Sequence, residues 1–158
     1  MLIRRIEKRD DAKVAYIIRA CLTEYGQAGN PNCAWADPHL DHFSAYYVRG
    51  DNAYWVAEND DGEVVAGAGI GPLDGEDGVC ELQKMYCLAE YRGCGMAQAL
   101  LDRALEFAAE HYKRCYIETF ANMGRAQNFY KRNGFTPIDH AMGSTGHTAC
   151  ECWYIKEL

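Results

Sequence analysis

Apolar residues recur at the spacing of one helix face in two long stretches of the chain. The first stretch starts near Asp10 and Asp11, either of which can cap a helix, and its stripe is Val14, Ile17, Ile18, Cys21 and Leu22. The second follows Gly95, and its stripe is Met96, Ala97, Leu100, Leu101, Ala104, Leu105 and Ala108. These patterns predict two amphipathic helices, the second over residues 95–111.

Short apolar runs bounded by turn residues predict strands through most of the remaining chain. The predicted strands are 2–7, 53–58, 64–71, 79–87, 114–120, 135–140 and 149–156. A hairpin signal, Asn-Asp-Asp-Gly, separates the second strand from the third, and an acidic turn at 72–78 follows the third. Further helices are predicted at 38–47, opened by Pro38, and at 122–133. This order of elements predicts an α/β fold with a mixed central sheet.

One predicted strand contains the unusually small run Ala66-Gly67-Ala68-Gly69. Small residues in a strand are typical of close packing by a helix or an aromatic ring against that strand. We therefore expect a neighbouring element to lie tightly on this segment.

Length and charge narrow the class of protein. The chain has 158 residues, enough for one domain with its own core, and we expect that domain to span residues 1–158. No apolar run is long enough to cross a membrane, and the first ten residues do not resemble a secretory signal, so a cytoplasmic location is expected. The formal net charge of −7 argues against nucleic acid and favours a cationic or amine partner. The sequence leaves open whether the protein forms a homodimer.

The eight cysteines are scattered and form no Cys-x-x-Cys pair. Without a secretory signal, reduced thiols are the expected state. His147 with Cys150 and Cys152 is the one metal-like group, but a structural zinc takes four ligands and no matching pair is evident. We therefore expect no metal.

A glycine-rich turn, Arg-Gly-Cys-Gly-Met-Ala, opens the second predicted helix. Bare backbone amides at the positive end of a helix dipole suit an anion such as pyrophosphate. The nucleotide loop pattern G-x-x-x-x-G-K-[ST] is absent, and the dinucleotide pattern G-x-G-x-x-G/A fails because position 98 is Gln98. A third pattern, [QR]-x-x-G-x-[GA], is filled by Arg92, Gly95 and Ala97.

The third pattern resembles the pyrophosphate loop of the GNAT superfamily of acyl-CoA-dependent N-acetyltransferases. Two flanking segments extend the resemblance: residues 81–87 (ELQKMYC) are similar to the family's central strand, and residues 126–135 (AQNFYKRNGF) match A-x-x-[LF]-Y-x-x-x-G-F. The resemblance is strongest over residues 52–140. It implies the GNAT fold, a mixed and mostly antiparallel central sheet with helices on both faces, and acetyl transfer from acetyl-CoA to an amine.

The resemblance also implies where acetyl-CoA binds. The loop amides would cradle the pyrophosphate, with Arg92 adding charge, and they belong to Gly93, Cys94, Gly95, Met96, Ala97 and Gln98. The pantetheine arm would pair with the backbone of Met85, Tyr86 and Cys87, where the central strand diverges from its neighbour. The family commonly has an asparagine seven residues before its tyrosine. That position is Met123 here, so the adjacent Asn122 is either a cofactor contact or a helix cap.

Three residues are candidates for the chemistry. The family motif makes Tyr130 the general acid, because a phenol with a pKa near 10 stays protonated where a thiol with a pKa near 8.5 departs. Glu81 and Glu118 are alternative bases, since acids in apolar strands are costly unless they line a wet cleft. His140 and His147 are weaker candidates, because a lone histidine near a strand end is usually structural.

The acceptor region implied by the resemblance comprises the first two helices, the loop between them and the turn at 143–147. Its aromatic and acidic residues favour a small amine-bearing molecule, without identifying it. The expected function is therefore acetylation of a small primary amine. The alternatives are acetylation of a protein lysine or N-terminus, and a non-catalytic acyl-CoA-binding module.

Overall fold

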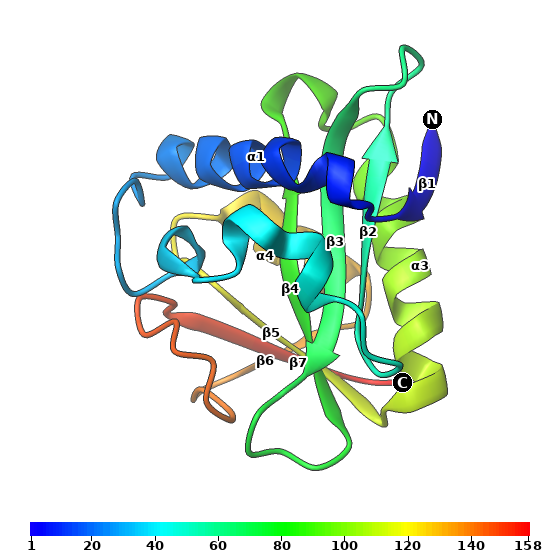
Figure 1. The fold of residues 1–158 in the computed structure, drawn as a ribbon. Coiled ribbons are helices and arrows are strands. Elements are labelled where there is room, and N and C mark those ends of the chain that lie inside the picture. The colour runs from blue at the N-terminus through cyan, green and yellow to red at the C-terminus, as the bar shows by residue number, and fades with distance from the viewer.

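The computed structural model describes all residues, 1–158, and its strands form one seven-stranded sheet (Figure 1). The strand order is β1-β2-β3-β4-β5-β7-β6. The bounds are β1 Leu2–Arg5, β2 Ala53–Glu58, β3 Val64–Pro72, β4 Val79–Cys87, β5 Arg114–Thr119, β6 Thr136–Ile138 and β7 Cys152–Glu157. All neighbouring strands are antiparallel except β4 and β5, which confirms the predicted mixed, mostly antiparallel sheet.

Helices cover both faces of the sheet. The helices are α1 Asp11–Glu24, α2 Phe43–Tyr46, α3 Met96–His111 and α4 Gly124–Arg132. The alternation along β2 assigns the two faces, because Trp55 packs in the core cluster with α3, whereas Tyr54 and Val56 pack in the cluster with α1. Tyr130 of α4 belongs to the cluster on the α3 face.

The small run in β3 lies directly beneath an aromatic ring. A Cβ atom on Gly67 would lie 2.5 Å from the Tyr54 hydroxyl, and one on Gly69 would lie 2.6 Å from the same ring. This confirms the packing explanation for the small residues. The Tyr54 hydroxyl then donates a 2.9 Å hydrogen bond to the backbone oxygen of Lys84, on the neighbouring strand.

Strand β4 contains a bulge at that point. Gly67 pairs with Tyr86 and Gly69 pairs with Gln83, so two residues of β4 lie opposite one residue of β3. Lys84 has φ of 51°, in the left-handed region that non-glycine residues rarely adopt. The Tyr54 hydrogen bond therefore stabilises a strained bend in the central strand.

Beyond this bend β4 leaves β5. The two strands pair at three positions only, the last being Glu81 with Tyr116, while β5 stays paired with β7 as far as Thr119. Residues 82–87 of β4 therefore present a backbone edge that β5 does not cover. The divergence implied by the family resemblance is present.

The structure corrects several sequence-based boundaries. The helix predicted at 38–47 is a 3-10 turn at Leu40–His42 followed by α2, and strands β6 and β7 are shorter than predicted. Asp10, one of the two predicted cap residues, is the N-cap residue of α1, but its side chain makes no capping hydrogen bond to the helix. Its carboxylate accepts instead from Arg4 and from the Glu7 amide, and the Asp11 carboxylate accepts from the Ser44 amide. All eight cysteines are free. No helix is both long enough and apolar enough to cross a membrane.

Candidate active site

Six consecutive backbone amides at the start of α3 have no partner within the protein. The amides of residues 93–98 donate no hydrogen bond, and the first one of the helix runs from Ala99 to the Gly95 oxygen at 3.0 Å. Gly93 and Gly95 have φ of 80° and 88°, and no atom lies within 4 Å of where their Cβ atoms would be. The loop therefore offers unpaired N–H donors at the positive end of a 16-residue helix, which fits a pyrophosphate.

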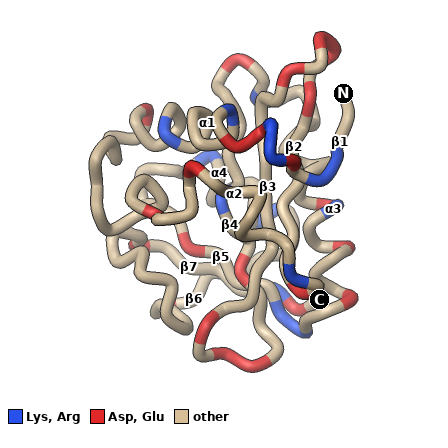
Figure 2. The backbone as a smooth tube through the Cα atoms, in the orientation of Figure 1, with Lys and Arg blue, Asp and Glu red and all other residues tan.

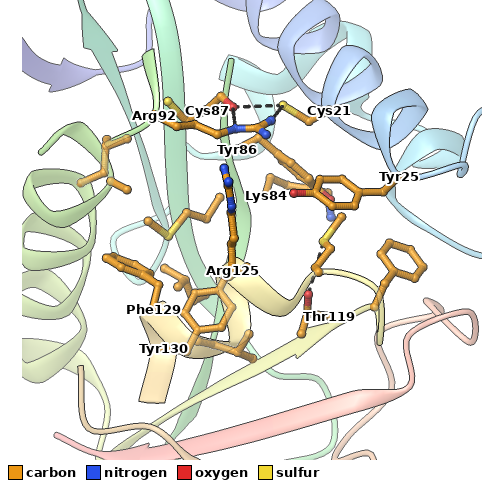
Figure 3. Close-up of a pocket in the computed structure, with 18 of the residues that line it drawn as sticks. Cys21, Tyr25, Lys84, Tyr86, Cys87, Arg92, Thr119, Arg125, Phe129 and Tyr130 are labelled. Carbon is orange, nitrogen blue, oxygen red and sulfur yellow. Dashed lines mark hydrogen bonds between the residues drawn. The ribbon is translucent and has the colours of Figure 1, made fainter. Parts of the chain in front are cut away.

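Arg92 is already engaged by an acid. Its guanidinium donates two 2.7 Å hydrogen bonds to the Glu24 carboxylate, and its Nε donates to the Cys87 oxygen at 2.9 Å. These contacts tie α1 to the end of β4 and compensate the arginine's charge. Arg125, at the start of α4, forms no ion pair and extends toward the same region (Figure 3).

A cavity of about 920 Å³ lies where β4 and β5 diverge. Most of the candidate residues line it, namely Glu81, Met85, Tyr86, Cys87, Arg92, Gly93, Gly95, Ala97, Gln98, Glu118 and Tyr130. Cys94, Met96 and Asn122 are not among the lining residues. Asn122 also does not cap α4, because its side chain donates to the Tyr25 oxygen at 3.1 Å and the cap position is Met123.

Tyr130 projects from α4 into this cavity, beside Phe129 (Figure 3). The residue is only 7% exposed, and its hydroxyl forms no hydrogen bond with the protein. Burial raises the pKa of Tyr130. The side chain therefore presents a protonated, unshared donor to the cavity at neutral pH.

A cluster of ionisable side chains forms where the two strands part. Single side-chain atoms of Glu81, Glu118 and His147 all lie within 4.8 Å of one another. Nδ1 of His147 is 3.7 Å from Oε1 of Glu118, and its Nε2 is 2.7 Å from Oδ1 of Asp37. Lys84 Nζ lies 2.5 Å from Oδ2 of the same aspartate. The site thus contains three acids, one lysine and one histidine.

Sequence patterns did not predict Asp37 or Lys84 as members of this cluster. They made His147 only a weaker candidate. The contact of His147 with Asp37 joins residues 110 positions apart, and no local pattern signals such a contact. Lys84 is the bulge residue, and its side chain is only 10% exposed.

Glu81 is a buried acid of this cluster. One carboxylate oxygen accepts a 2.8 Å hydrogen bond from Gln83, whereas the other oxygen has no partner. Burial raises the pKa of Glu81, against the opposing effect of nearby Lys84. Glu118 differs, because it accepts hydrogen bonds from both Tyr116 and Thr145.

Glu81, Glu118 and His147 are also the residue types that could hold a metal ion. Lys84, whose charge acts on Glu81, places an ammonium group beside them. Both oxygens of Glu118 are already used by hydroxyl donors. The arrangement is therefore better suited to proton transfer than to holding a metal ion.

Comparisons with known proteins agree with this geometry. The model of the Acetyltransferase (GNAT) family matches residues 14–135. A relative from Escherichia coli (strain K12), named Uncharacterized N-acetyltransferase YjgM, is 44% identical, with coverage of 99% of this chain and 95% of that protein. A GNAT-family acetyltransferase structure from Staphylococcus aureus Mu50 has a TM-score of 0.86 at 21% identity, covering 99% of this chain and 98% of that one.

A structure of the PaiA N-acetyltransferase from Thermoplasma acidophilum, determined in complex with coenzyme A, has a TM-score of 0.70 at 14% identity. It covers 99% of this chain and 98% of its own. The chain belongs to the GNAT family. It is an acetyl-CoA-dependent N-acetyltransferase.

The free loop amides predict the effect of filling the space before them. Gly95→Trp should abolish the rise in melting temperature that acetyl-CoA causes, because an indole would occupy the phosphate position. Gly62→Trp is the matched control, since Gly62 also has a positive φ and open surroundings but lies in the β2–β3 turn. Thermal-shift titrations measure both variants. If acetyl-CoA still raises the melting temperature of Gly95→Trp by the full amount, the pyrophosphate binds elsewhere.

The burial of Glu81 predicts a pH-dependent gain in stability when its charge is removed. A carboxyl whose folded-state pKa is raised favours folding at low pH, and this contribution is lost as pH rises through the folded-state pKa. Glu81→Gln should therefore raise the melting temperature at about pH 8 more than at about pH 4, by roughly 2–4 °C per kcal/mol recovered.

Glu118→Gln is the contrasting variant for this measurement. Glu118 accepts from two hydroxyl groups, and an amide nitrogen in place of one oxygen would face a donor. It should lower the melting temperature. If Glu81→Gln is instead destabilising throughout the pH range, the Glu81 carboxylate is a structural acceptor.

Proposed function

We propose that the protein transfers an acetyl group from acetyl-CoA to a primary amine of a small molecule by direct attack, with Tyr130 as general acid. One observation carries the proposal. A single cavity connects the loop of unpaired amides, which lines it through Gly93, Gly95, Ala97 and Gln98, with an uncovered strand edge, a buried tyrosine hydroxyl and a cluster of carboxylates. These are the groups that holding an acyl donor and moving two protons require.

The positions of these groups support a division of labour. The amides of residues 93–98 would hold the pyrophosphate, and the backbone of residues 85–87 would hold the pantetheine arm. Bound acetyl-CoA supplies an activated thioester. Tyr130 would keep its proton on Oη until it is donated to the departing sulfur, and its raised pKa supports that role.

Proton removal from the amine is assigned to the acid cluster. Glu81 has an unpartnered oxygen and a raised pKa, which brings a carboxylate closer to the basicity that a general base needs. Glu118 remains the alternative, through its proximity to His147. Water between either acid and the amine is compatible with both assignments.

The cysteines of the cavity support direct attack over a covalent acyl-enzyme. Burial raises the pKa of Cys87 to about 11 and that of Cys150 to about 12. The thiolate is the nucleophilic form of cysteine, so both side chains are poor nucleophiles at neutral pH. The acceptor amine is then the attacking group.

Loop contacts favour a small acceptor over a protein. The Ser144 amide donates to the Asp74 oxygen at 2.9 Å, and Thr145 donates to Glu118, so the turn at 143–147 is fastened over the acceptor side. The Ala149 amide donates to the Asn32 oxygen at 3.1 Å. A long peptide would need an open groove there. A non-catalytic module would not need the unshared Tyr130 hydroxyl.

The general-acid assignment predicts a loss of rate without a loss of binding. Tyr130→Phe should reduce turnover by about 10²–10⁴-fold and leave acetyl-CoA affinity nearly unchanged, because only the hydroxyl is removed. Release of the CoA thiol, measured across a panel of amines, gives the rate. Tyr154→Phe is the control, since its ring packs beside Tyr130 while its hydroxyl binds Gln127. An unchanged rate would leave Tyr130 as a core residue.

The base assignment predicts a difference between two pH–rate profiles. Glu81→Gln should lose most of its rate at low pH and regain part of it as the free amine becomes abundant at higher pH. Glu118→Gln should act mainly on the KM of the acceptor. Profiles of kcat and kcat/KM against pH separate these cases. The reverse pattern would make Glu118 the base, and two unaltered profiles would remove both acids from the chemistry.

A further inference from the structure

A second, smaller cavity of about 210 Å³ adjoins the site just described. Glu81, Lys84 and His147 line both cavities, so the acid cluster stands between them. The remaining walls come from α2 with the loop preceding it, from the β3–β4 turn and from the turn at 143–147. Asp74 and Tyr46 lie on these walls.

The charges in the smaller cavity are unevenly compensated. Asp37 is in contact with two nitrogen groups, the Lys84 ammonium at 2.5 Å and the His147 imidazole at 2.7 Å. Glu81 has one unpartnered oxygen although it is more than nine-tenths buried, and Asp74 forms no ion pair. The β3–β4 turn that carries Asp74 is strongly acidic (Figure 2). One carboxylate with an unpartnered oxygen therefore lies deep in the cavity, and a carboxylate without an ion pair lies at its exposed rim.

An aromatic surface lines the same cavity as these two carboxylates. Tyr46 is 39% exposed, stacks on His39 with ring centroids 5.0 Å apart, and meets Tyr47 edge to face. Its side chain lines the cavity together with Asp74 and Glu81. An exposed tyrosine face beside carboxylates is a favourable environment for an ammonium group.

We propose that the acceptor is a short aliphatic diamine, or a longer polyamine, bound as a cation with two charged ends. The reacting amine would lie beside Glu81, and the distal ammonium would lie at Tyr46 and Asp74. Tyr46, Asp74 and Glu81 line one cavity of about 210 Å³. A cavity of this size suits a chain of a few methylene groups.

The proposal rests on the proposed function for its chemistry. The reacting ammonium gives one proton to the acid cluster and becomes a free amine. Its N–C bond forms as the C–S bond of the thioester breaks, and the sulfur takes the Tyr130 proton. The second proton that the new amide nitrogen loses restores the Tyr130 hydroxyl. The distal ammonium keeps all its protons and serves recognition only.

Binding of three amines with the same number of carbons tests the inference without turnover. Putrescine has a second ammonium, butylamine has a methyl group and γ-aminobutyrate has a carboxylate at the distal end. Calorimetry on the CoA-loaded protein should show putrescine binding about threefold to thirtyfold more tightly than butylamine, with γ-aminobutyrate weakest. Equal affinity for putrescine and butylamine, or tighter binding of γ-aminobutyrate, overturns the inference.

The Asp74→Asn variant tests whether Asp74 causes the preference for putrescine over butylamine. The Asp74 side chain forms no hydrogen bond or ion pair, so the variant should fold, lose most of the putrescine advantage and leave butylamine affinity unchanged. Asp77→Asn is the control, because Asp77 is exposed on the same turn but does not line the cavity. An equal loss in both variants would overturn the assignment to Asp74.

Turnover separates this inference from the proposed function. If butylamine is acetylated as efficiently as putrescine, the function stands and the diamine inference is wrong. If no amine is acetylated while Asp74-dependent putrescine binding persists, the binding site stands and the function is wrong.

Discussion

The short parallel ladder between β4 and β5 is the constraint on which the site depends. It ends at Glu81, because the bulge at Lys84 bends β4 away from its neighbour. Tyr54 fixes that bend by donating to the Lys84 oxygen, and it fits only because Gly67 and Gly69 lack side chains. Buried backbone groups require hydrogen-bond partners, so the uncovered edge of β4 favours a ligand that carries amides of its own. A core packing contact thus determines where a cofactor can pair.

The acid cluster is held by contacts that a stable fold alone would not need. Glu81 is buried with an unpartnered oxygen, and burial raises its pKa. His147 and Lys84 converge on Asp37, and these contacts join the loop before α2 and the turn at 143–147 to the bend of β4. Such a network is costly to desolvate, and perturbed carboxyl pKa values in a cavity are typical of functional sites, which supports the proposed proton transfer. The same contacts enclose the acceptor side.

Periodicity and glycine position were sufficient to predict the long elements and the anion loop. The stripe after Gly95 and the short apolar runs bounded by turn residues are local patterns, and the structure confirms the helix and the strands that they predict. The helix at 38–47 was predicted too long. Asp10 is the N-cap residue of α1, but other contacts occupy its carboxylate, so it makes no capping hydrogen bond. Asp37 was missed for a related reason: its partners Lys84 and His147 are distant in sequence, and no spacing rule links them.

The amide end and the acid end of the cavity favour opposite charges. This difference would place each of the two substrates at its own end. Unpaired amides at the start of α3 attract phosphate oxygens, whereas the acids near Glu81 attract a protonated amine. A polyphosphate is repelled from the acid end, and a cation gains nothing from the amide end. Tyr130 lies in the cavity that joins the two ends, with a neutral donor that suits a sulfur leaving one substrate for the other. In the proposed function, this charge separation along one cavity would orient the acyl donor and the acceptor before any catalytic group acts.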